Sequence, residues 1–422
     1  MAQLSDDCFA GADRLITTSE ALDILAASVS PVAATSRVPL RAASRRILAE
    51  DVISPIDVPP HANSAVDGYA VYFADLDRDR PTELRVGGRA AAGHPLGRRA
   101  ERGEAVRIFT GAPMPEGPDT VMMQEDCTEA GGIVTIMPGI KQGANRRAAG
   151  EDVTAGRTVL REGIRLRPQD IGLAAAVGRT ELSVFAPVRA AVFSTGDEVG
   201  QPGAVLESGQ IYDSNRYMTI AALEALGCDV ADLGILPDRP EMIAAAIREA
   251  AAGHDLLVTS GGMSVGEEDH VGAAVTQNGN LHFWRLAIKP GRPVSLGQVR
   301  SGNRTAAFIG LPGNPVAAMV TFLLIGRPVA LRLGGAREIA PTTYRVRAAF
   351  DHKKKMDRRE YVRAHLSTGE DGVPQAHKHG ASGAGILSSL VGADGLVELP
   401  EDMTYLEFGG MVDFLPFNEV LA

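Results

Sequence analysis

The sequence predicts a multidomain α/β protein with a central, doubly wound α/β domain. From Val188 to about Gly335, apolar strand-like runs alternate with helical patterns, which is typical of a parallel sheet covered by helices on both faces. Between residues 55 and 145 the chain is dense in glycine and proline and its apolar runs are short. After Gly335 the helical patterns fade and short strands follow. These changes in composition and hydrophobic pattern predict separate domains around the α/β core.

The N-terminal part is expected to be helical. Residues 17–29 (TTSEALDILAASV) carry a candidate cap at Ser19 followed by an apolar pattern, and residues 39–52 begin with a proline, which is common at a helix start. A helical pattern returns in GEDVTAGRTVLREGIRLRPQDIGLAAAVG, after the β-rich stretch. We therefore assign residues 1–54 and 146–187 to one helical and linker domain.

Residues 55–145 are expected to form a β-rich domain inserted into that helical part. The segment TVMMQEDCTEAGGIVTIM predicts a hairpin with Gly131 and Gly132 at its turn, because two glycines between strand-like runs favour a tight β-turn.

The region 188–335 predicts the α/β domain itself. Its strand candidates lack strict alternation of apolar and polar residues, as strands buried on both faces do. They are residues 189–195, 229–236, 254–260, 281–288 and 305–313. The helical patterns between them are residues 214–227, 240–253 and 267–279. Ligands of such domains bind at the carboxyl ends of the strands, so the functional residues are expected there.

Residues 336–422 predict a small β domain or barrel. Short strand-like runs separated by turns support it. They are TTYRVRAAF, EYVRAHLS, DGLVELP and MVDFLP.

Composition excludes several classes of protein. The 422 residues carry a formal net charge of −10, which argues against a nucleic-acid binder, because such proteins usually present a basic face. The three cysteines show no Cys-x-x-Cys spacing and the N-terminus has no signal-peptide pattern, so we expect a cytoplasmic protein without disulfides. The longest apolar stretch, residues 314–333, is interrupted by Arg327 and Pro328. It predicts a buried helix that ends at this point rather than a membrane span.

Polar and glycine-rich loops follow three of the predicted strands. TSGGMSVGEEDH begins at Thr259, STGDE at Ser194 and GLPGNP at Gly310. Glycines permit close backbone approach and can form an anion-binding nest, and the carboxylates that follow suggest a divalent cation between them and a phosphate. A tight turn followed by acidic residues at a helix N-terminus explains the first loop alone equally well. Three such ends in one domain favour a pocket for phosphate and metal.

The segment FWRLAIKPGRPVSLG places Arg285, Lys289 and Arg292 beside these loops. Cations around a Pro-Gly turn can hold an oxyanion, with arginine as a planar fork and lysine as a point charge. No Ser-His-Asp or Cys-His arrangement supports nucleophilic catalysis. His377 and His379 have no third ligand nearby in the sequence and are interpreted as surface residues rather than a zinc site.

Eight motifs, taken in order, resemble the molybdopterin molybdenumtransferase family, also called MoeA, which includes the E domain of gephyrin. They are SAVDGYA, TGAPMPEGPDTV, RRAAGED, STGDE, YDSN, TSGGMSVGEEDH, IKPGRP and GLPGNPVAA. The resemblance covers nearly the whole chain. The first three motifs lie upstream of the α/β domain, which itself is similar to that of MogA-type adenylyltransferases, and they favour the MoeA family.

The resemblance implies an enzyme that inserts molybdenum from molybdate into adenylylated molybdopterin and releases AMP, with a divalent cation such as Mg²⁺. It also implies a homodimer with a shared active site, and as protein partners the molybdopterin adenylyltransferase and molybdoenzymes. Neither a nucleic acid nor a membrane is expected as a partner. Two alternatives remain open: an adenylyltransferase-type enzyme of the preceding step, and a gephyrin-like scaffold that binds a partner peptide.

Residue roles follow from the motif matches. Asp67 matches an aspartate that reaches the site from the second subunit. The catalytic candidates are Asp67, Asp152, Glu198, Asp238, Asp269 and Lys289. Glu198 and Asp269 are also the candidate metal ligands. The substrate-binding candidates are Thr110, Ser194, Thr195, Gly196, Ser260, Gly261, Gly262, Ser264, Gly266, Arg285, Arg292, Pro312, Gly313, Asn314 and Pro315.

The chain departs from the family pattern at two places. Arg285 and Arg292 stand where relatives often carry lysine, which keeps the charge but changes its shape. Ala393-Asp394 replaces an Ala-Asn pair close to Ser388 and Ser389, so no role is carried over to these serines.

Overall fold

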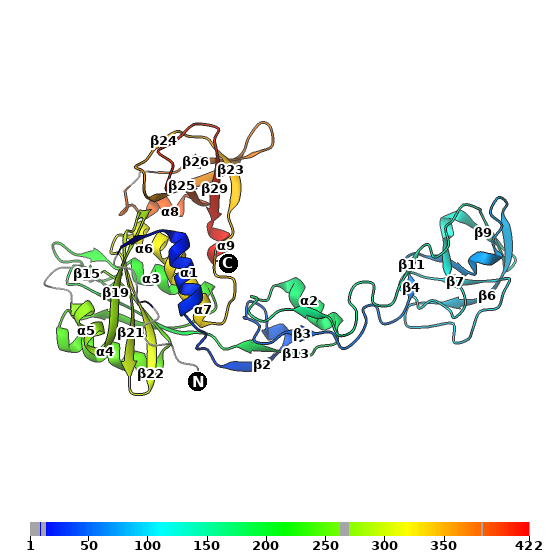
Figure 1. Ribbon diagram of the computed structural model, residues 1–422, viewed down its shortest axis with the longest axis horizontal. Coiled ribbons are helices and arrows are strands. Elements are labelled where there is room, and N and C mark those ends of the chain that lie inside the picture. The colour runs from blue at the N-terminus through cyan, green and yellow to red at the C-terminus, as the bar shows by residue number, and fades with distance from the viewer. Residues whose placement is uncertain (1–8, 10–13, 262–269, 381–382, 422) are drawn as a thin grey trace.

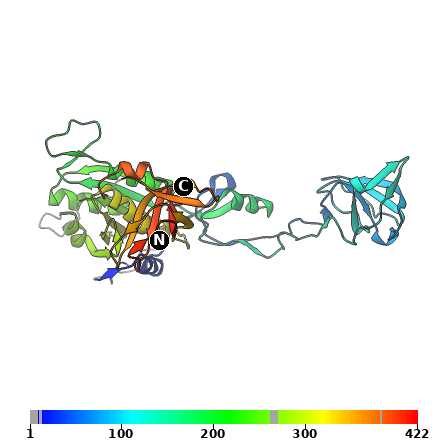
Figure 2. The same ribbon diagram turned by 90° about the horizontal axis from the view of Figure 1, so that it is seen from above.

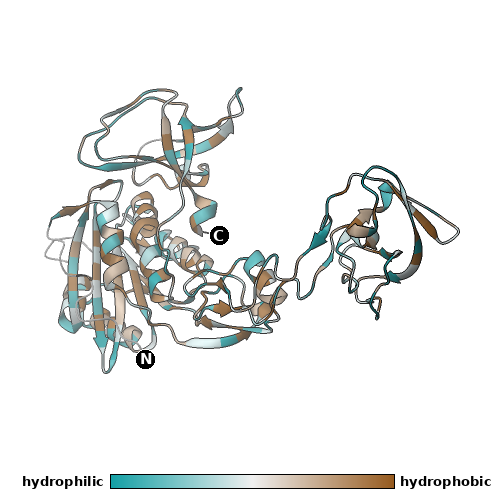
Figure 3. Ribbon diagram, turned by 45° about the vertical axis from the view of Figure 1, so that its right-hand side comes forward, coloured by the Kyte–Doolittle hydropathy of each residue, from teal (hydrophilic) through white to brown (hydrophobic). Residues whose placement is uncertain are grey.

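The computed structural model describes residues 9, 14–261, 270–380 and 383–421. The molecule is elongated: a β-rich lobe stands at one end and is joined by extended chain to a larger body (Figures 1 and 2). The body contains the α/β domain, the helical N-terminal segment and, beside the α/β domain, the C-terminal β domain. In Figure 3 brown, apolar residues gather on the helices and strands that pack together inside the body.

The central sheet has seven strands in the order β1-β19-β21-β22-β18-β14-β17. They are β1 (Leu15–Ile16), β14 (Arg189–Thr195), β17 (Asp229–Leu236), β18 (Leu256–Ser260), β19 (Gly279–Leu286), β21 (Pro293–Ser301) and β22 (Arg304–Leu311). The five predicted strands are confirmed. The sequence analysis missed β1 and β21, and β21 runs antiparallel to both of its neighbours. Its sequence, PVSLGQVRS, mixes polar residues with a glycine and therefore lacks the apolar run by which the other strands were recognised.

Helices cover both faces of this sheet, which confirms the doubly wound arrangement. Ala190 and Val192 of β14 belong to the same core as Leu223, whereas Ala191 and Phe193 pack with Ile243 on the opposite face. The helices of the domain are α3 (Asn215–Ala225), α4 (Pro240–Gly253) and α5 (His270–Asn278), with a short parallel pair, β15 (Val199–Gly200) and β16 (Ile211–Tyr212), after the first strand.

A 19-residue helix runs from Pro315 to Leu333, so the expected end at Gly326-Arg327-Pro328 was wrong. It consists of α6 (Pro315–Thr321), a π-helical turn (Phe322–Gly326) and α7 (Arg327–Leu333). The wider turn, with its i→i+5 bonds, lets the chain continue past a proline that would break a regular α-helix. By length and composition this helix could cross a membrane, but 83% of its apolar window is buried in the protein, as expected of a core helix.

The first helix, α1 (Thr18–Ser28), begins one residue after its cap, which is Thr17 rather than the expected Ser19. The Thr17 hydroxyl accepts the Glu20 N–H at 3.2 Å and Glu20 Oε2 accepts the Thr17 N–H at 2.9 Å. This reciprocal capping box fixes the start of the helix.

The helix expected over residues 39–52 is wrong, because only a 3-10 turn (Leu40–Ala42) forms there. Long-range pairing of its flanks overrides the local pattern. β2 (Thr35–Pro39) pairs with β13 (Glu181–Phe185), and β3 (Val52–Ile53) pairs with β12 (Thr158–Leu160). For the same reason the helical pattern that returns after residue 150 yields one helix, α2 (Pro168–Ala176).

The lobe is a β domain that lies inside the expected range 55–145. Its six-stranded sheet contains β5 (Gly68–Val71), β6 (Thr82–Ala90), β7 (Glu104–Ile108), β8 (Thr120–Met123), β9 (Cys127–Ala130) and β10 (Ile133–Ile136). β4 (Asn63–Ser64) and β11 (Arg146–Arg147) pair at its base. The predicted hairpin is confirmed: Ala130 is opposite Ile133, and Gly131 and Gly132 both have positive φ, as a tight hairpin turn requires.

The C-terminal domain is a closed five-stranded barrel, as the sequence suggested. Closure follows because β25 (Arg359–Thr368) pairs with both β26 (Pro374–Lys378) and β27 (Gly395–Leu399). The other barrel strands are β23 (Tyr344–Ala348) and β29 (Met411–Pro416). Smaller elements are β24 (His352–Lys353), β28 (Tyr405–Leu406), α8 (Ser388–Val391) and α9 (Phe417–Leu421). A two-residue strand of the α/β domain, β20 (Ile288–Lys289), pairs with the start of β25.

The change Gly326→Ala is expected to destabilise the fold although alanine is the better helix former. The added methyl carbon would lie 2.7 Å from the ring of Phe322, which is 2% exposed. Overpacking of about 1–3 kcal/mol would therefore exceed a helix-propensity gain of about 1 kcal/mol. Urea unfolding followed by circular dichroism should show a lower midpoint.

Gly172→Ala in α2 is the matched control, because no atom lies within 4 Å of a carbon added at that exposed helical position. Its unfolding midpoint should stay or rise. A Gly326→Ala protein at least as stable as the parent would contradict the described packing.

Candidate functional site

Three strand ends that the sequence analysis singled out lie side by side at the carboxyl edge of the sheet. Ser194 of β14 is opposite Ser260 of β18, and Ser260 is opposite Leu311 of β22. The Gly261 N–H donates to the Leu311 carbonyl at 3.3 Å. The loops after these strands are therefore neighbours, and together they form one face on which a ligand can lie.

Glycines let these loops approach one another and a neighbouring carboxylate. Gly196 and Gly261 have φ values of +123° and +81°, which side chains rarely tolerate. A carbon added to Gly196 would lie 2.4 Å from Glu198 Oε2, so the exposed Glu198 carboxylate folds back over the end of β14. A carbon added to Gly313 would lie 3.7 Å from the Gly261 Cα, which places the second and third loops in contact.

The third loop is fixed by the YDSN motif at the start of α3. Asn215 Nδ2 donates to the Gly313 carbonyl at 2.7 Å. The next residue, Arg216, is 2% exposed and forms ion pairs with Asp213 at 2.9 Å and with Asp232. This buried charge network ties the beginning of α3 to β17 and so holds Asn215 in place.

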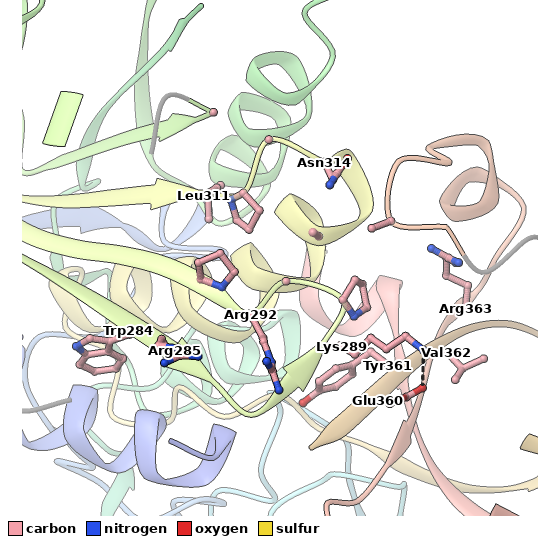
Figure 4. Close-up of a pocket in the computed structure, with 18 of the residues that line it drawn as sticks. Trp284, Arg285, Lys289, Arg292, Leu311, Asn314, Glu360, Tyr361, Val362 and Arg363 are labelled. Carbon is pink, nitrogen blue, oxygen red and sulfur yellow. Dashed lines mark hydrogen bonds and ion pairs between the residues drawn. The ribbon is translucent and has the colours of Figure 1, made fainter. Parts of the chain in front are cut away.

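A cavity of ≈ 980 Å³ opens between the α/β domain and the C-terminal barrel (Figure 4). The α/β domain supplies the loops after β18 and β22 and the segment between β19 and β21, and the barrel supplies β24, β25 and the chain around the end of β26. The polar and charged lining residues are Arg285, Lys289, Arg292, Asn314, His352, Glu360, Tyr361, Arg363, Lys378 and His379. In a chain with a net charge of −10, this concentration of cations gives the cavity a local charge suited to an anionic ligand.

The three basic residues that were predicted to bind an oxyanion, Arg285, Lys289 and Arg292, are therefore part of the cavity wall. Arg285 is the penultimate residue of β19 and Arg292 follows the Pro-Gly turn, and both side chains are exposed. Lys289 Nζ lies 3.2 Å from Glu360 Oε2 of the barrel (Figure 4). Two forked cations and one point charge on a single loop can receive the oxygens of a tetrahedral anion.

The other predicted residues of the α/β domain divide into three groups. Gly261, Pro312, Gly313 and Asn314 line the cavity with the basic residues. Ser194, Thr195, Gly196, Glu198, Asp238, Ser260 and Pro315 belong to the same edge of the sheet or the start of α6 but are not among the described lining residues. Gly262, Ser264, Gly266 and Asp269 lie outside the described residues.

Asp67, Thr110 and Asp152 lie in the lobe and its connection to the body, and none of them is among the described lining residues of the cavity. The lobe stands at the opposite end of the molecule from the α/β domain and the barrel (Figure 1). Asp67 Oδ1 accepts the Thr110 N–H at 2.7 Å and the Thr110 hydroxyl at 2.8 Å. These two hydrogen bonds, and to a smaller extent the charge of Arg107, lower the pKa of Asp67 below its usual value. Asp67 is thus a fixed carboxylate at the surface of the lobe, and Asp152 is exposed.

No group of three or more His, Cys, Asp or Glu side chains is arranged to hold a metal among residues 9, 14–261, 270–380 and 383–421. Oxygen atoms suited to a hard cation do lie at the carboxyl edge. The Glu198 carboxylate is exposed there, and the Ser194 hydroxyl, 1% exposed, has no hydrogen-bond partner within the described part of the chain. This donor set fits a weakly coordinated Mg²⁺, which prefers oxygen ligands and keeps several waters.

Sequence reasoning missed the contribution of the barrel. His352, Glu360, Arg363 and Lys378 line the cavity, and His379, interpreted as a surface residue, lines it too. The available signal was the strand REYVRAH, which places charged residues at positions that the structure buries: Glu360 is 2% and Arg363 is 7% exposed. Buried charges in a strand need partners, and here the partners come from other elements.

Comparisons with known proteins agree with this architecture. Three family models match: the MoeA N-terminal region (domain I and II) over residues 16–178, a probable molybdopterin binding domain over 191–332, and the MoeA C-terminal region (domain IV) over 345–417. A molybdopterin molybdenumtransferase of Haemophilus influenzae is 39% identical over 390 residues, which is 92% of this chain and 95% of the relative. One from Nostoc is 35% identical over 89% of this chain and 87% of the relative.

Among solved structures, the molybdopterin biosynthesis MoeA protein of Pyrococcus horikoshii OT3 is similar to this chain, with a TM-score of 0.79 and 28% sequence identity. The match covers 96% of this chain and 100% of that chain. The family models together span the lobe, the α/β domain and the barrel, and the identities hold over nearly the full length. The chain belongs to the molybdopterin molybdenumtransferase (MoeA) family, a family of transferases of molybdenum cofactor biosynthesis.

Proposed function

We propose that this protein inserts molybdenum from molybdate into adenylylated molybdopterin, with release of AMP and dependence on a divalent cation such as Mg²⁺. Family membership supports insertion of molybdenum into molybdopterin. Within the structure one observation carries the proposal: a single cavity joins the glycine-rich ends of β18 and β22 to the basic segment Arg285–Arg292.

The cavity and the adjoining carboxyl edge of the sheet offer groups suited to the separate demands of that reaction. Backbone N–H groups at the glycine-rich strand ends can bind the phosphates of the nucleotide. Arg285, Lys289 and Arg292 can bind the tetrahedral oxyanion. Glu198 and Asp269, the latter outside the described residues, would hold the cation, which when bound offsets the charge of the phosphates. The pterin dithiolene would hold the molybdenum itself, so the protein needs no thiolate cluster.

We propose further that the active enzyme is a homodimer in which the lobe of one subunit reaches the cavity of the other. The supporting observation is that Asp67 belongs to the lobe, which stands at the other end of the elongated molecule from the α/β domain and the barrel (Figure 1). We also assign the reaction to the cytoplasm, and the unpaired Cys127 and Cys228 agree with a reducing compartment.

Purified adenylylated molybdopterin should release AMP when this protein, Mg²⁺ and molybdate are all present, and molybdenum should be found in the pterin product. Chromatography of AMP and elemental analysis of the product measure the two events. A protein that instead makes AMP-pterin from ATP and molybdopterin is an adenylyltransferase, and one that binds the nucleotide without releasing AMP is a binding protein. Either result would contradict molybdenum insertion.

Mixed dimers should test the shared site. Asp67→Asn and Arg292→Gln are each expected to lower AMP release by about 100-fold, because each removes a charge that a transition-state contact needs. Mixing the two variants and allowing subunits to exchange should restore up to a quarter of the wild-type activity per site, because one site of each mixed dimer is intact. A mixture as inactive as its components, although mass spectrometry shows mixed dimers, would place both residues in the same site of one chain.

A further inference from the structure

We propose that Glu360 is a positioning residue: it holds the Lys289 ammonium in the cavity wall, so that this cation is in place only when the barrel is docked on the α/β domain. The inference rests on the proposed function for the identity of the anion that Lys289 binds. Its geometric part, the placement of Lys289 by Glu360, stands on the structure alone.

Glu360 is a buried carboxylate surrounded by cationic groups. It is 2% exposed. Its Oε2 lies 3.2 Å from Lys289 Nζ and 3.1 Å from His352 Nε2, and its Oε1 accepts hydrogen bonds from Arg358 Nε at 3.1 Å and Nη2 at 2.8 Å. A carboxylate removed from water to this degree needs such partners, since an unpaired buried charge is strongly destabilising.

The ionisation of Glu360 agrees with this role. Burial alone raises the pKa of a carboxyl group, but at Glu360 the hydrogen bonds from His352 and Lys289 outweigh burial and lower the pKa below its usual value. The group therefore carries its negative charge at neutral pH, where it attracts the Lys289 ammonium.

Lys289 and Glu360 come from different domains, and strand pairing places them opposite each other. β20 pairs in parallel with the start of β25, with Ile288 opposite Arg359 and Lys289 opposite Glu360. The Arg359 N–H also donates to the Ala287 carbonyl at 2.7 Å. This short ladder across the domain boundary sets the distance between the two side chains, so movement of the barrel would separate them.

The exposure of the two side chains shows that Lys289, and not Glu360, is accessible to a ligand. The Lys289 side chain is 47% exposed, whereas that of Glu360 is 3% exposed, and both line the cavity (Figure 4). An ammonium has three donors, and Glu360 takes one of them, which leaves others for a ligand. Without Glu360 the flexible four-carbon stem would sample many rotamers, and anion binding would have to order it.

A second carboxylate of the barrel, the half-buried Glu398, provides a control. Glu398 of β27 is the cross-strand partner of Tyr361 and lies 3.1 Å from Arg359 Nη1. It is held by an arginine, as Glu360 is by Arg358, but it does not line the described cavity wall and contacts no residue of the basic segment Arg285–Arg292 in the described structure. Neutralising it removes a partly buried ion pair of the same sheet without removing the partner of Lys289.

Brief acetylation of the full-length protein with acetic anhydride, read by peptide mass spectrometry, measures how firmly Lys289 is held. In Glu360→Gln the rate at Lys289, relative to the exposed Lys353, should rise about tenfold, because a charged hydrogen bond that protects the amine is lost. The KM for molybdate should rise by a similar factor while kcat changes less. Glu398→Gln should leave both quantities within about twofold of the wild type.

Glu360→Asp keeps the charge on a shorter side chain and carries the test if the glutamine variant does not fold. It should raise Lys289 acetylation by about threefold, since the shorter carboxylate holds the ammonium less well. Unchanged acetylation of Lys289 in the folded Glu360 variant, or an equal rise in Glu398→Gln, would overturn the positioning role. Acetylation needs no substrate, so it decides this point separately from a wild-type protein without molybdate-dependent AMP release, which would overturn the proposed function instead.

Discussion

The contact between β20 and β25 is the constraint on which the site depends. Four residues of two domains pair there, and this pairing brings the barrel against the carboxyl edge of a sheet whose loops could otherwise face open solvent. The cavity of ≈ 980 Å³ exists only between these two surfaces. Its basic wall comes from a loop of the α/β domain, while the carboxylate that orders Lys289 comes from the barrel. An anion site built in this way couples ligand binding to the relative position of the domains.

The lobe, which contains β4 to β11, is not part of the cavity. The lobe carries Asp67 and Thr110 in a fixed hydrogen-bonded pair, yet it stands at the far end of the elongated molecule (Figures 1 and 2). Asp67 is not among the described residues that line the cavity of its own chain. In the proposed homodimer, the lobe of a second subunit would reach this cavity, which would explain both the extended connection and the hydrogen-bonded Asp67.

Local patterns were enough to predict much of this fold from the sequence. β17, α4 and β29 have the predicted bounds, because apolar runs and helical periodicity are properties of short segments. The convergence of Ser194, Ser260 and Gly310 also followed, since parallel strands end at one edge. Effects of distant residues were missed. Strand pairing at both ends of residues 39–52 replaced the expected helix, and a π-helical turn let another helix continue past Pro328. The partners of Glu360 include Lys289 and His352, which lie in other elements. No local signal in the sequence identifies the distant partners in such contacts.

The central claim is that the cavity between the α/β domain and the barrel binds the oxyanion. Crystals of the protein grown with molybdate, measured at the molybdenum absorption edge, would locate the metal directly by its anomalous signal. We expect a peak inside the cavity, at a position where the oxygens of the molybdate are within hydrogen-bonding distance of the side chains of Lys289 and Arg292. A strong peak elsewhere on the protein, with an empty cavity, would contradict it.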